Sequence, residues 1–435
     1  MSELSLVEHA LCPLDSVKSL SGPLRHHASY WYFDRRRNRK KATAVVKAVD
    51  GLSAYDEFYL WGILGLVFAQ PEPSVNFYAT RNFILRQLGV VVGGENYQLL
   101  ESSLRRLAGV RYSNDKFFDP MRGEHRQVSF GFLSFSIPAN PNSQRAWHIA
   151  IDPILFGFVE PIKAHFSFDL DTYRSLDPAS RRLFLVLKKI FHRSVNSPRW
   201  DLMHLAVDVL GYSSLERKFL KRKVKACADR LAKLGIIRSS EGVFGKQGKN
   251  LHVQFQRGSY FDRRLSIPRV ARVEELPIYE QWLAIGVDAD GMQYLKRNFS
   301  MDLLQQWADI TLAAKERHGP QFFERSMAAY YIDNVKAAKM DGRGPPDWWH
   351  EFKKQELYAL SSSANDAAQQ VAQPSRRQYL EWLKGDGRKL HEETLRTLFA
   401  SVEVHGRVTP SDASTIQRKV DVVLWKEFLA RSLFK

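Results

Sequence analysis

The stretch SSLERKFLKRKVKACADRLAKL, residues 213–234, separates into an apolar side and a basic side at helical spacing. Ser213 and Glu216 have the spacing of a capping box, and Gly235 follows as a stop signal, so we expect a helix over the whole stretch. Its apolar side predicts packing on a core and consists of Leu220, Val224, Cys227, Leu231 and Leu234. Its opposite side carries the cations Lys218, Lys221, Arg222, Lys225 and Lys233.

A helix with this charge distribution can lie in a DNA major groove, where its cations face phosphates and base edges. A solvated surface helix shows the same pattern, so composition has to distinguish the two. The chain has 435 residues and a net charge of +17, with 44% hydrophobic residues, enough for several domain cores. A charge excess of this size attracts polyanions, of which nucleic acid is the usual one, and therefore favours the DNA interpretation.

An anionic membrane surface is the alternative polyanion. No apolar run approaches the length of about eighteen residues that a spanning helix requires. The N-terminus also lacks the apolar core of a signal peptide. Cys12 and Cys227, the two cysteines of the chain, fit a reducing compartment, and Cys227 belongs to the apolar side of the helix. We therefore expect a cytoplasmic protein without a membrane partner.

The residues around the basic helix predict a winged helix. One helix over 178–193 and a short helix over 202–210 precede it. After it the pattern predicts two strands, at 236–237 and 251–255, joined by a loop that carries Lys246 and Lys249. Three helices followed by a basic-tipped hairpin form a winged helix, in which the third helix enters the groove and the hairpin contacts the DNA backbone.

The same order occurs earlier in the chain, where helices are expected over 53–68, 80–88 and 95–107, followed by alternating strands between 128 and 151. Glu95 and Glu101 offset Arg105 and Arg106 in this copy, so its third helix is close to neutral. We infer that the second copy is the main reader of DNA. The first copy makes supporting backbone contacts through its arginines or serves as a protein interface.

Residues 1–45 are expected to form an arm in which aromatic residues adjoin a basic block that contains Arg35, Arg36 and Arg37. A solvated, disordered arm is one interpretation, and an auxiliary contact with DNA phosphates is the other. The expected fold class is α+β, mainly α. The expected domains are the arm 1–45, winged-helix domains 46–160 and 161–262, a helical region 263–360, a linker 361–375 and a small helical appendage 376–435.

Several segments resemble bacterial plasmid replication initiators of the replication initiator protein A family. They are YDEFYLWGILGLVF, residues 80–90, KAHFSFDLDTYRSLD, and the stretch from DPASRRLFLVLKKIFHR to NLHVQF, which together cover about residues 50–260. The resemblance implies two winged-helix domains bound to repeated origin sequences, and recruitment of the host's initiator and replicative helicase. It also implies an exchange between homodimers and DNA-binding monomers, with the first domain providing the dimer contact.

An enzymatic function has one candidate signal. Asp169 and Asp171 follow an alternating segment, and a strand that ends in paired carboxylates can hold the metal ions of a nucleotidyl transferase or primase. The alternative is that these acids begin the second winged helix, with Asp177 as the cap of the helix that follows. No phosphate-binding loop is recognisable, because Val243 and Asn250 stand where glycine and Ser or Thr belong.

The sequence therefore predicts a DNA-binding initiator of plasmid or prophage replication, without catalytic residues, metal or cofactor. A winged-helix transcriptional regulator is the second interpretation, since it would use the same DNA-binding face. An enzyme of the primase class is the third.

Overall fold

The computed structural model describes residues 5–33, 38–160, 170–213, 216–247, 250–262 and 272–355, together with 382–383, 388, 390–394, 420 and 424. With 53% helix and 18% strand, the fold is α+β and mainly α, as predicted. The chain divides into two compact units, Met1–His350 and Glu351–Lys435. Several predicted site residues lie outside the described residues, namely Arg35, Arg36, Arg37, Lys249 and Asp169.

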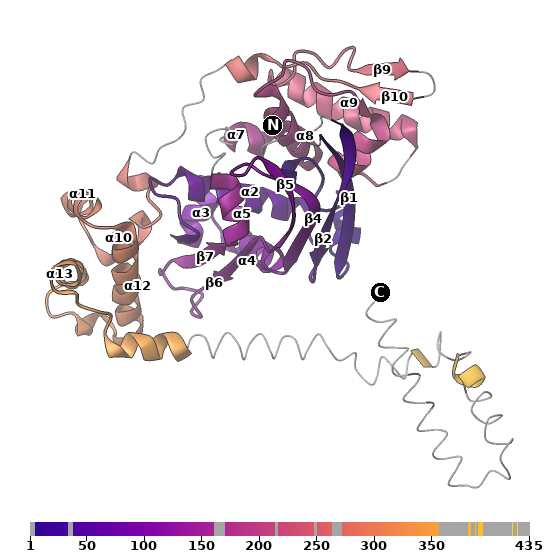
Figure 1. Cartoon of the computed structure of the whole chain (residues 1–435). Coiled ribbons are helices and arrows are strands. Elements are labelled where there is room, and N and C mark those ends of the chain that lie inside the picture. The colour runs from indigo at the N-terminus through magenta and orange to yellow at the C-terminus, as the bar shows by residue number, and fades with distance from the viewer. Residues whose placement is uncertain are drawn as a thin grey trace, which may run out of the picture. The chain divides into compact units, whose positions relative to one another are not determined.

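The first winged helix is built from three helices and a small antiparallel sheet (Figure 1). Ser53 and Asp56 form the capping box that starts the first helix, and Thr80 caps the second. The three strands are hydrogen-bonded in the order first, third, second. The elements are α2 (Ala54–Ala69), β3 (Asn76–Ala79), α3 (Arg81–Gln87), α4 (Gly94–Ala108), β6 (Leu133–Ser136) and β7 (Trp147–Ile151).

The second winged helix repeats this order of elements and the same order of strands in its sheet, β8-β10-β9. Asp177 caps its first helix by accepting the amide hydrogen of Ser180, as predicted. The second helix has π-helical hydrogen bonding and precedes Gly211, whose φ is +81°. The elements are α8 (Pro178–Phe191), β8 (Trp200–Asp201), η3 (His204–Val209), α9 (Arg217–Lys233), β9 (Phe244–Gln247) and β10 (Asn250–Val253).

Two local predictions for this unit are wrong. Helix α9 begins at Arg217, not near Ser213, because Glu216 has extended backbone angles and is itself the N-cap, so it cannot close a capping box as the third helical residue. The strand expected at residues 236–237 makes only an isolated bridge from Ile237 to Arg257, although both isoleucines are buried in the core as a strand there would predict. The outer strand of the hairpin is β9 instead, within the segment that was expected to be a loop.

A four-stranded antiparallel sheet adjoins the first winged helix, with the strand order β1-β2-β4-β5. Its strands are β1 (Leu24–Phe33), β2 (Arg39–Ala48), β4 (Val110–Asp119) and β5 (Glu124–Phe130). The arm expected over 1–45 is therefore wrong for the residues in β1 and β2. Their alternation was weak in hydropathy because small residues such as Ala28, Ala42 and Ala44 form much of the buried face.

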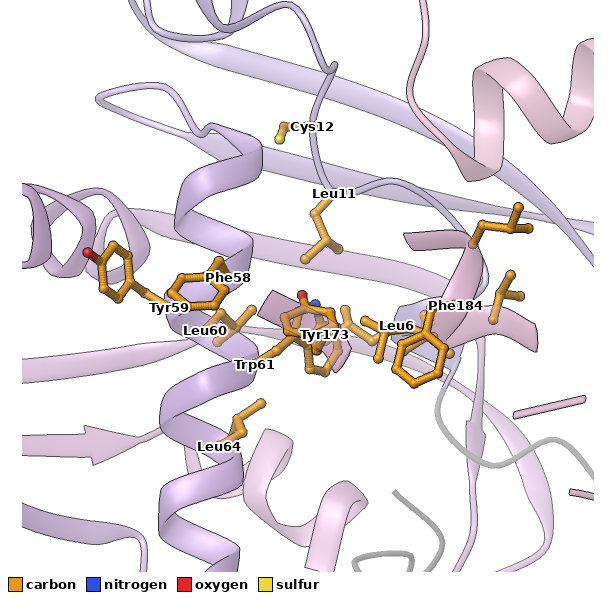
Figure 2. Packing of buried hydrophobic residues seen from close by; sticks show 14 of the residues in the cluster. Leu6, Leu11, Cys12, Phe58, Tyr59, Leu60, Trp61, Leu64, Tyr173 and Phe184 are labelled. Atoms are coloured by element: carbon orange, nitrogen blue, oxygen red, sulfur yellow. The ribbon is translucent and has the colours of Figure 1, made fainter. Parts of the chain in front are cut away.

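The N-terminal segment lies between the two winged helices and belongs to one continuous core. Leu6, Leu11 and Cys12 are buried together with residues of α2, among them Leu60, and with Phe184 of α8 (Figure 2). The hydroxyl of Tyr112 in β4 lies 2.9 Å from Nε2 of His9, and the amide of Ala10 donates to the carbonyl of Asp208 in η3 at 2.8 Å. The N-terminal segment thus joins both winged helices.

A helical module follows the second winged helix, consisting of α10 (Tyr279–Ile285), α11 (Ala289–Asn298), α12 (Met301–His318) and α13 (Met327–Asp341). Its core contains Trp282, whose indole donates to the buried hydroxyl of Tyr331 at 2.9 Å, and Trp307. The remaining short elements are η1 (Ser5–Val7), α1 (Ser16–Ser19), α5 (Pro153–Val159), α7 (Leu170–Ser175), η4 (Ser259–Asp262), η5 (Val273–Glu275) and η6 (Pro320–Phe322). None of the described helices has both the length and the apolar character needed to cross a membrane.

Candidate nucleic-acid interface

Helix α9 has one buried side and one exposed basic side, as the sequence predicts. Its apolar residues Leu220, Val224, Cys227 and Leu231 are fully buried. The exposed residues include Lys218, Lys221, Arg222 and Lys233. These four cations therefore lie on the solvent side of the third helix of the second winged helix, where a DNA groove would meet them.

Lys225 differs from its neighbours because it is bound within the protein. Its ammonium donates to the carboxylate of Asp229 one helical turn later, and to the hydroxyl of Ser240 at 3.0 Å. The hydrogen bond from Lys225 is the main reason that the pKa of Asp229 lies below its usual value. Lys225 links α9 to the segment that leads into the hairpin, so it is less free to contact DNA than the sequence prediction assumed.

Phe219 supports two cations of the exposed side. The guanidinium carbon of Arg222 lies 4.9 Å from the centroid of the Phe219 ring, and the ammonium of Lys223 lies 5.1 Å from it. Lys223 is exposed but was missing from the predicted site residues. A helical projection places Lys223 beside the apolar side, so only the observed burial pattern shows that it is exposed.

The hairpin β9–β10 lies beside α9 (Figure 1), and a lysine of the helix contacts a phenylalanine ring of the hairpin. The ammonium of Lys221 lies 5.2 Å from the centroid of the Phe244 ring in β9. Lys246, in the same strand, is exposed and is paired through its backbone with Leu251 of β10. An exposed basic helix and a lysine-bearing hairpin strand are thus in contact, which is the geometry that winged helices use on DNA.

Polar contacts hold α9 in place behind this surface. Arg230 donates to the carboxylate of Asp177, the cap of α8, at 2.7 Å. The hydroxyl of Tyr212 lies 3.7 Å from the sulfur of Cys227. Burial raises the pKa of the Cys227 thiol, so this cysteine stays protonated and serves packing, as predicted.

The corresponding helix of the first winged helix lacks free cations at the predicted positions. Both oxygens of the fully buried Asp56 carboxylate accept from the guanidinium of Arg106, at 2.8 and 2.9 Å. Arg105 pairs with Glu101 at 2.6 Å on the surface. The prediction that Arg106 contacts DNA does not fit this arrangement, because the residue holds α4 against α2 across fifty positions of sequence.

The hairpin of the first winged helix is covered by the helical module. The carboxylate of Glu316 in α12 accepts from Nε of Arg145 at 3.3 Å, and Asp309 accepts from the amide of Ala146 at 3.1 Å. Glu280 of α10 pairs with Arg86 of α3 at 3.1 Å. Carboxylates of the helical module thus pair with basic and amide groups of the first winged helix that could otherwise bind DNA phosphates. The exposed cations of α9 in the second winged helix are more accessible to DNA.

Of the two acidic residues that suggested an enzyme, Asp169 lies outside the described residues and Asp171 lies within them. Asp171 lies in helix α7, is 81% exposed and pairs with Arg174 at 3.1 Å. Its position in a helix differs from the strand end that a metal-binding pair of carboxylates would need. Within the described residues, no three His, Cys, Asp or Glu side chains lie close enough to bind a metal ion.

The sequence matches no protein-family model and no curated protein. Two crystal structures of domains 2 and 3 of RctB are similar to this chain at low sequence identity. One has 12% sequence identity and a TM-score of 0.39, covering 56% of this chain and 96% of the RctB chain. The other has 12% identity and a TM-score of 0.37, covering 57% and 95%. The functional proposal below therefore rests on the residues of this chain.

Proposed function

We propose that this protein is a sequence-specific DNA-binding initiator of plasmid or prophage replication, and that its second winged helix binds double-stranded origin repeats. The observation that carries the proposal is that the exposed basic side of α9 contacts the lysine-bearing β9–β10 hairpin, where Lys221 lies over the ring of Phe244. Its cations are exposed, and the opposite side of the helix is buried in the core. The lysine-bearing hairpin packed beside the helix favours a DNA-binding surface over a solvated surface helix.

Different cations of this surface have different roles in the proposal. Arg222, held over Phe219 on the exposed side, is placed to reach a base edge, where a guanidinium can bind guanine through two hydrogen bonds. Lys233 at the end of α9 and Lys246 in the hairpin contact phosphates, which position the protein without reading sequence. Opening of the duplex then draws on binding energy and on recruited partners, with no cofactor and no catalytic residue.

A homodimer in equilibrium with a DNA-binding monomer, together with recruitment of the host initiator and the replicative helicase, belongs to the same proposal. The near-neutral outer side of α4 supports a protein contact at the first winged helix. Three apolar residues are exposed on α4 and the turn before it, namely Val91, Val92 and Leu99. Exposed apolar residues next to a neutral helix favour a protein partner over DNA.

A winged-helix transcriptional regulator is the alternative, because it would bind DNA through the same surface. The arrangement of binding sites distinguishes the two functions. An initiator should bind several repeats of about twenty base pairs beside an A·T-rich tract, whereas a regulator should bind a single palindrome over a promoter.

A mobility-shift titration with DNA that flanks the gene, compared with random DNA, tests the proposal. Arg222→Ala should cost about 1–3 kcal/mol of specific binding, whereas Lys233→Ala should weaken binding to both DNAs alike. Binding should also fall steeply with salt, because each phosphate contact releases counterions. Equal losses on specific and random DNA for every α9 variant would refute the reading helix, and binding that does not respond to salt would refute the DNA assignment.

A further inference from the structure

The four-stranded sheet β1-β2-β4-β5 has one buried face and one exposed face. Side chains alternate between the faces, and the buried face contains Tyr30, Val46 and Tyr112. The residues between them point outward, and most of them are exposed. The outward face of β1, β2 and β4 includes Arg25, His27, Ser29, Trp31, Lys41, Thr43, Lys47, Arg111 and Ser113.

The strand register places three cations in one row across this outward face. Arg25 of β1 is directly opposite Lys47 of β2, and Lys47 is directly opposite Arg111 of β4. Neighbouring strands lie about 4.8 Å apart, so the three side chains start close together on one face. Like charges in directly opposed positions destabilise a sheet, which makes this row unfavourable in the free protein.

No carboxylate neutralises the row within the described part of the chain. Arg111 donates to the hydroxyl of Ser129 at 3.0 Å, and neither Arg25 nor Lys47 has an acidic partner among the described residues. Asp115 is the acid on this face, and its carboxylate already accepts the amide hydrogen of Thr43 at 3.0 Å. The row is therefore suited to an external ligand with several negative charges.

Other features of the face favour a nucleic-acid backbone as that ligand. Lys41, whose charge also acts on the Asp208 carboxylate, is opposite Trp31, which is 41% exposed, and serine and threonine residues stand at other outward positions. Strand β1 also contacts the second winged helix, because the amide of Ser29 donates to Asp208 of η3 at 3.2 Å. The cationic sheet is thus attached directly to the unit that carries α9.

We propose that the outward sheet face around Arg25, Lys47 and Arg111 is a second DNA-contacting surface, which binds phosphates of the duplex next to the segment held by α9. This inference rests on the proposed function, in that α9 must hold duplex DNA for the sheet to meet its flank. The sheet contacts carry no sequence information, because they are made to phosphates. They lengthen the bound segment and increase affinity for specific and random DNA alike.

The test compares two triple variants of the full chain that lose the same charge. The face variant is Arg25→Gln, Lys47→Gln and Arg111→Gln. The control variant is Arg297→Gln, Arg325→Gln and Lys336→Gln, three exposed cations of the helical module. Apparent Kd is measured as a function of salt on specific and random duplexes, with Arg222→Ala and the wild-type protein in parallel, and the protected length is measured by footprinting.

The face variant should lower the slope of log affinity against log salt by about 2.7, at about 0.9 for each lost phosphate contact. It should weaken both duplexes by the same factor and shorten the footprint, and its melting temperature should not fall, because like-charge contacts are removed. The control variant should leave slope and footprint nearly unchanged. A face variant that matches the control, in a protein that still binds its site through Arg222, would overturn the sheet proposal alone. Failure of the wild-type protein to distinguish specific from random DNA would overturn the proposed function instead.

Discussion

The ion pair between Glu57 of α2 and Arg182 of α8 should be a large local contribution to the stability of the joined winged helices. Nε and Nη2 of Arg182 donate to the two carboxylate oxygens of Glu57 at 2.8 and 2.6 Å, and the side chains are 6% and 7% exposed. The carbonyl of Leu210 accepts a third hydrogen bond at 2.7 Å. Burial is the largest single influence and opposes the charged guanidinium, but the interactions with Glu57 and Cys12 together exceed it and raise the pKa of Arg182.

Arg182→Met should lower the free energy of unfolding by about 3–5 kcal/mol, because it leaves a buried carboxylate without its cation. That loss corresponds to a fall in Tm of roughly 6–20 °C. Glu57→Gln should have a similar cost, since it leaves the buried guanidinium without an anion. The double variant removes both charges and leaves the Leu210 carbonyl unpaired, at about 1–3 kcal/mol. It should therefore be more stable than Arg182→Met.

Urea unfolding followed by tryptophan fluorescence and by circular dichroism measures this cycle, provided that the two signals report one transition. A double variant less stable than either single variant, with a cost equal to the sum of the single costs, would refute the reasoning. It would show that Glu57 and Arg182 contribute independently, so that their contact does not join the two winged helices energetically.

Three further predictions concern other parts of the chain. Arg106→Ala should reduce stability by about 3–5 kcal/mol because the buried Asp56 carboxylate loses its cation and keeps, among the described residues, only its hydrogen bonds from Ser53 and Ser103, whereas Arg105→Ala should cost at most about 1 kcal/mol, as thermal denaturation can show. Burial lowers the pKa of His9 from its usual 6.5 to about 4. As the pH falls below about 6.5, His9 therefore binds a proton in the unfolded chain but not in the folded chain. His9 should therefore contribute a loss of stability of about 2 kcal/mol between about pH 7 and about pH 5, and His9→Gln should reduce the pH dependence measured in urea titrations by that amount. Burial lowers the pKa of His26 to about 4 as well, so a pH dependence from His26 should remain in this variant. Lys47→Gln should raise stability by about 0.2–1 kcal/mol for each like-charge contact that it relieves, and an unchanged Tm would contradict the row of opposed cations.

Local signals in the sequence were sufficient for the helices and for their repeated order. Apolar repeats at helical spacing, with Asp177 as the expected cap of α8, predicted α2, α3 and α8 close to their observed bounds. The buried and exposed sides of α9 also followed from spacing alone, because a residue's side of a helix depends only on its place in the helical repeat. The basic character of the candidate DNA-binding surface could therefore be predicted before the structure.

Contacts between distant residues were decided only by the tertiary structure. Strands β1, β2 and β4 exist because they pair with one another, and their small buried residues gave little signal in hydropathy. The sequence pattern places Arg106 on the surface, but in the structure it pairs with Asp56, fifty positions earlier. Only the strand register places Lys47 between two other cations. A charge pattern along the chain shows which side of an element a residue occupies, but its electrostatic partner depends on how the elements pack.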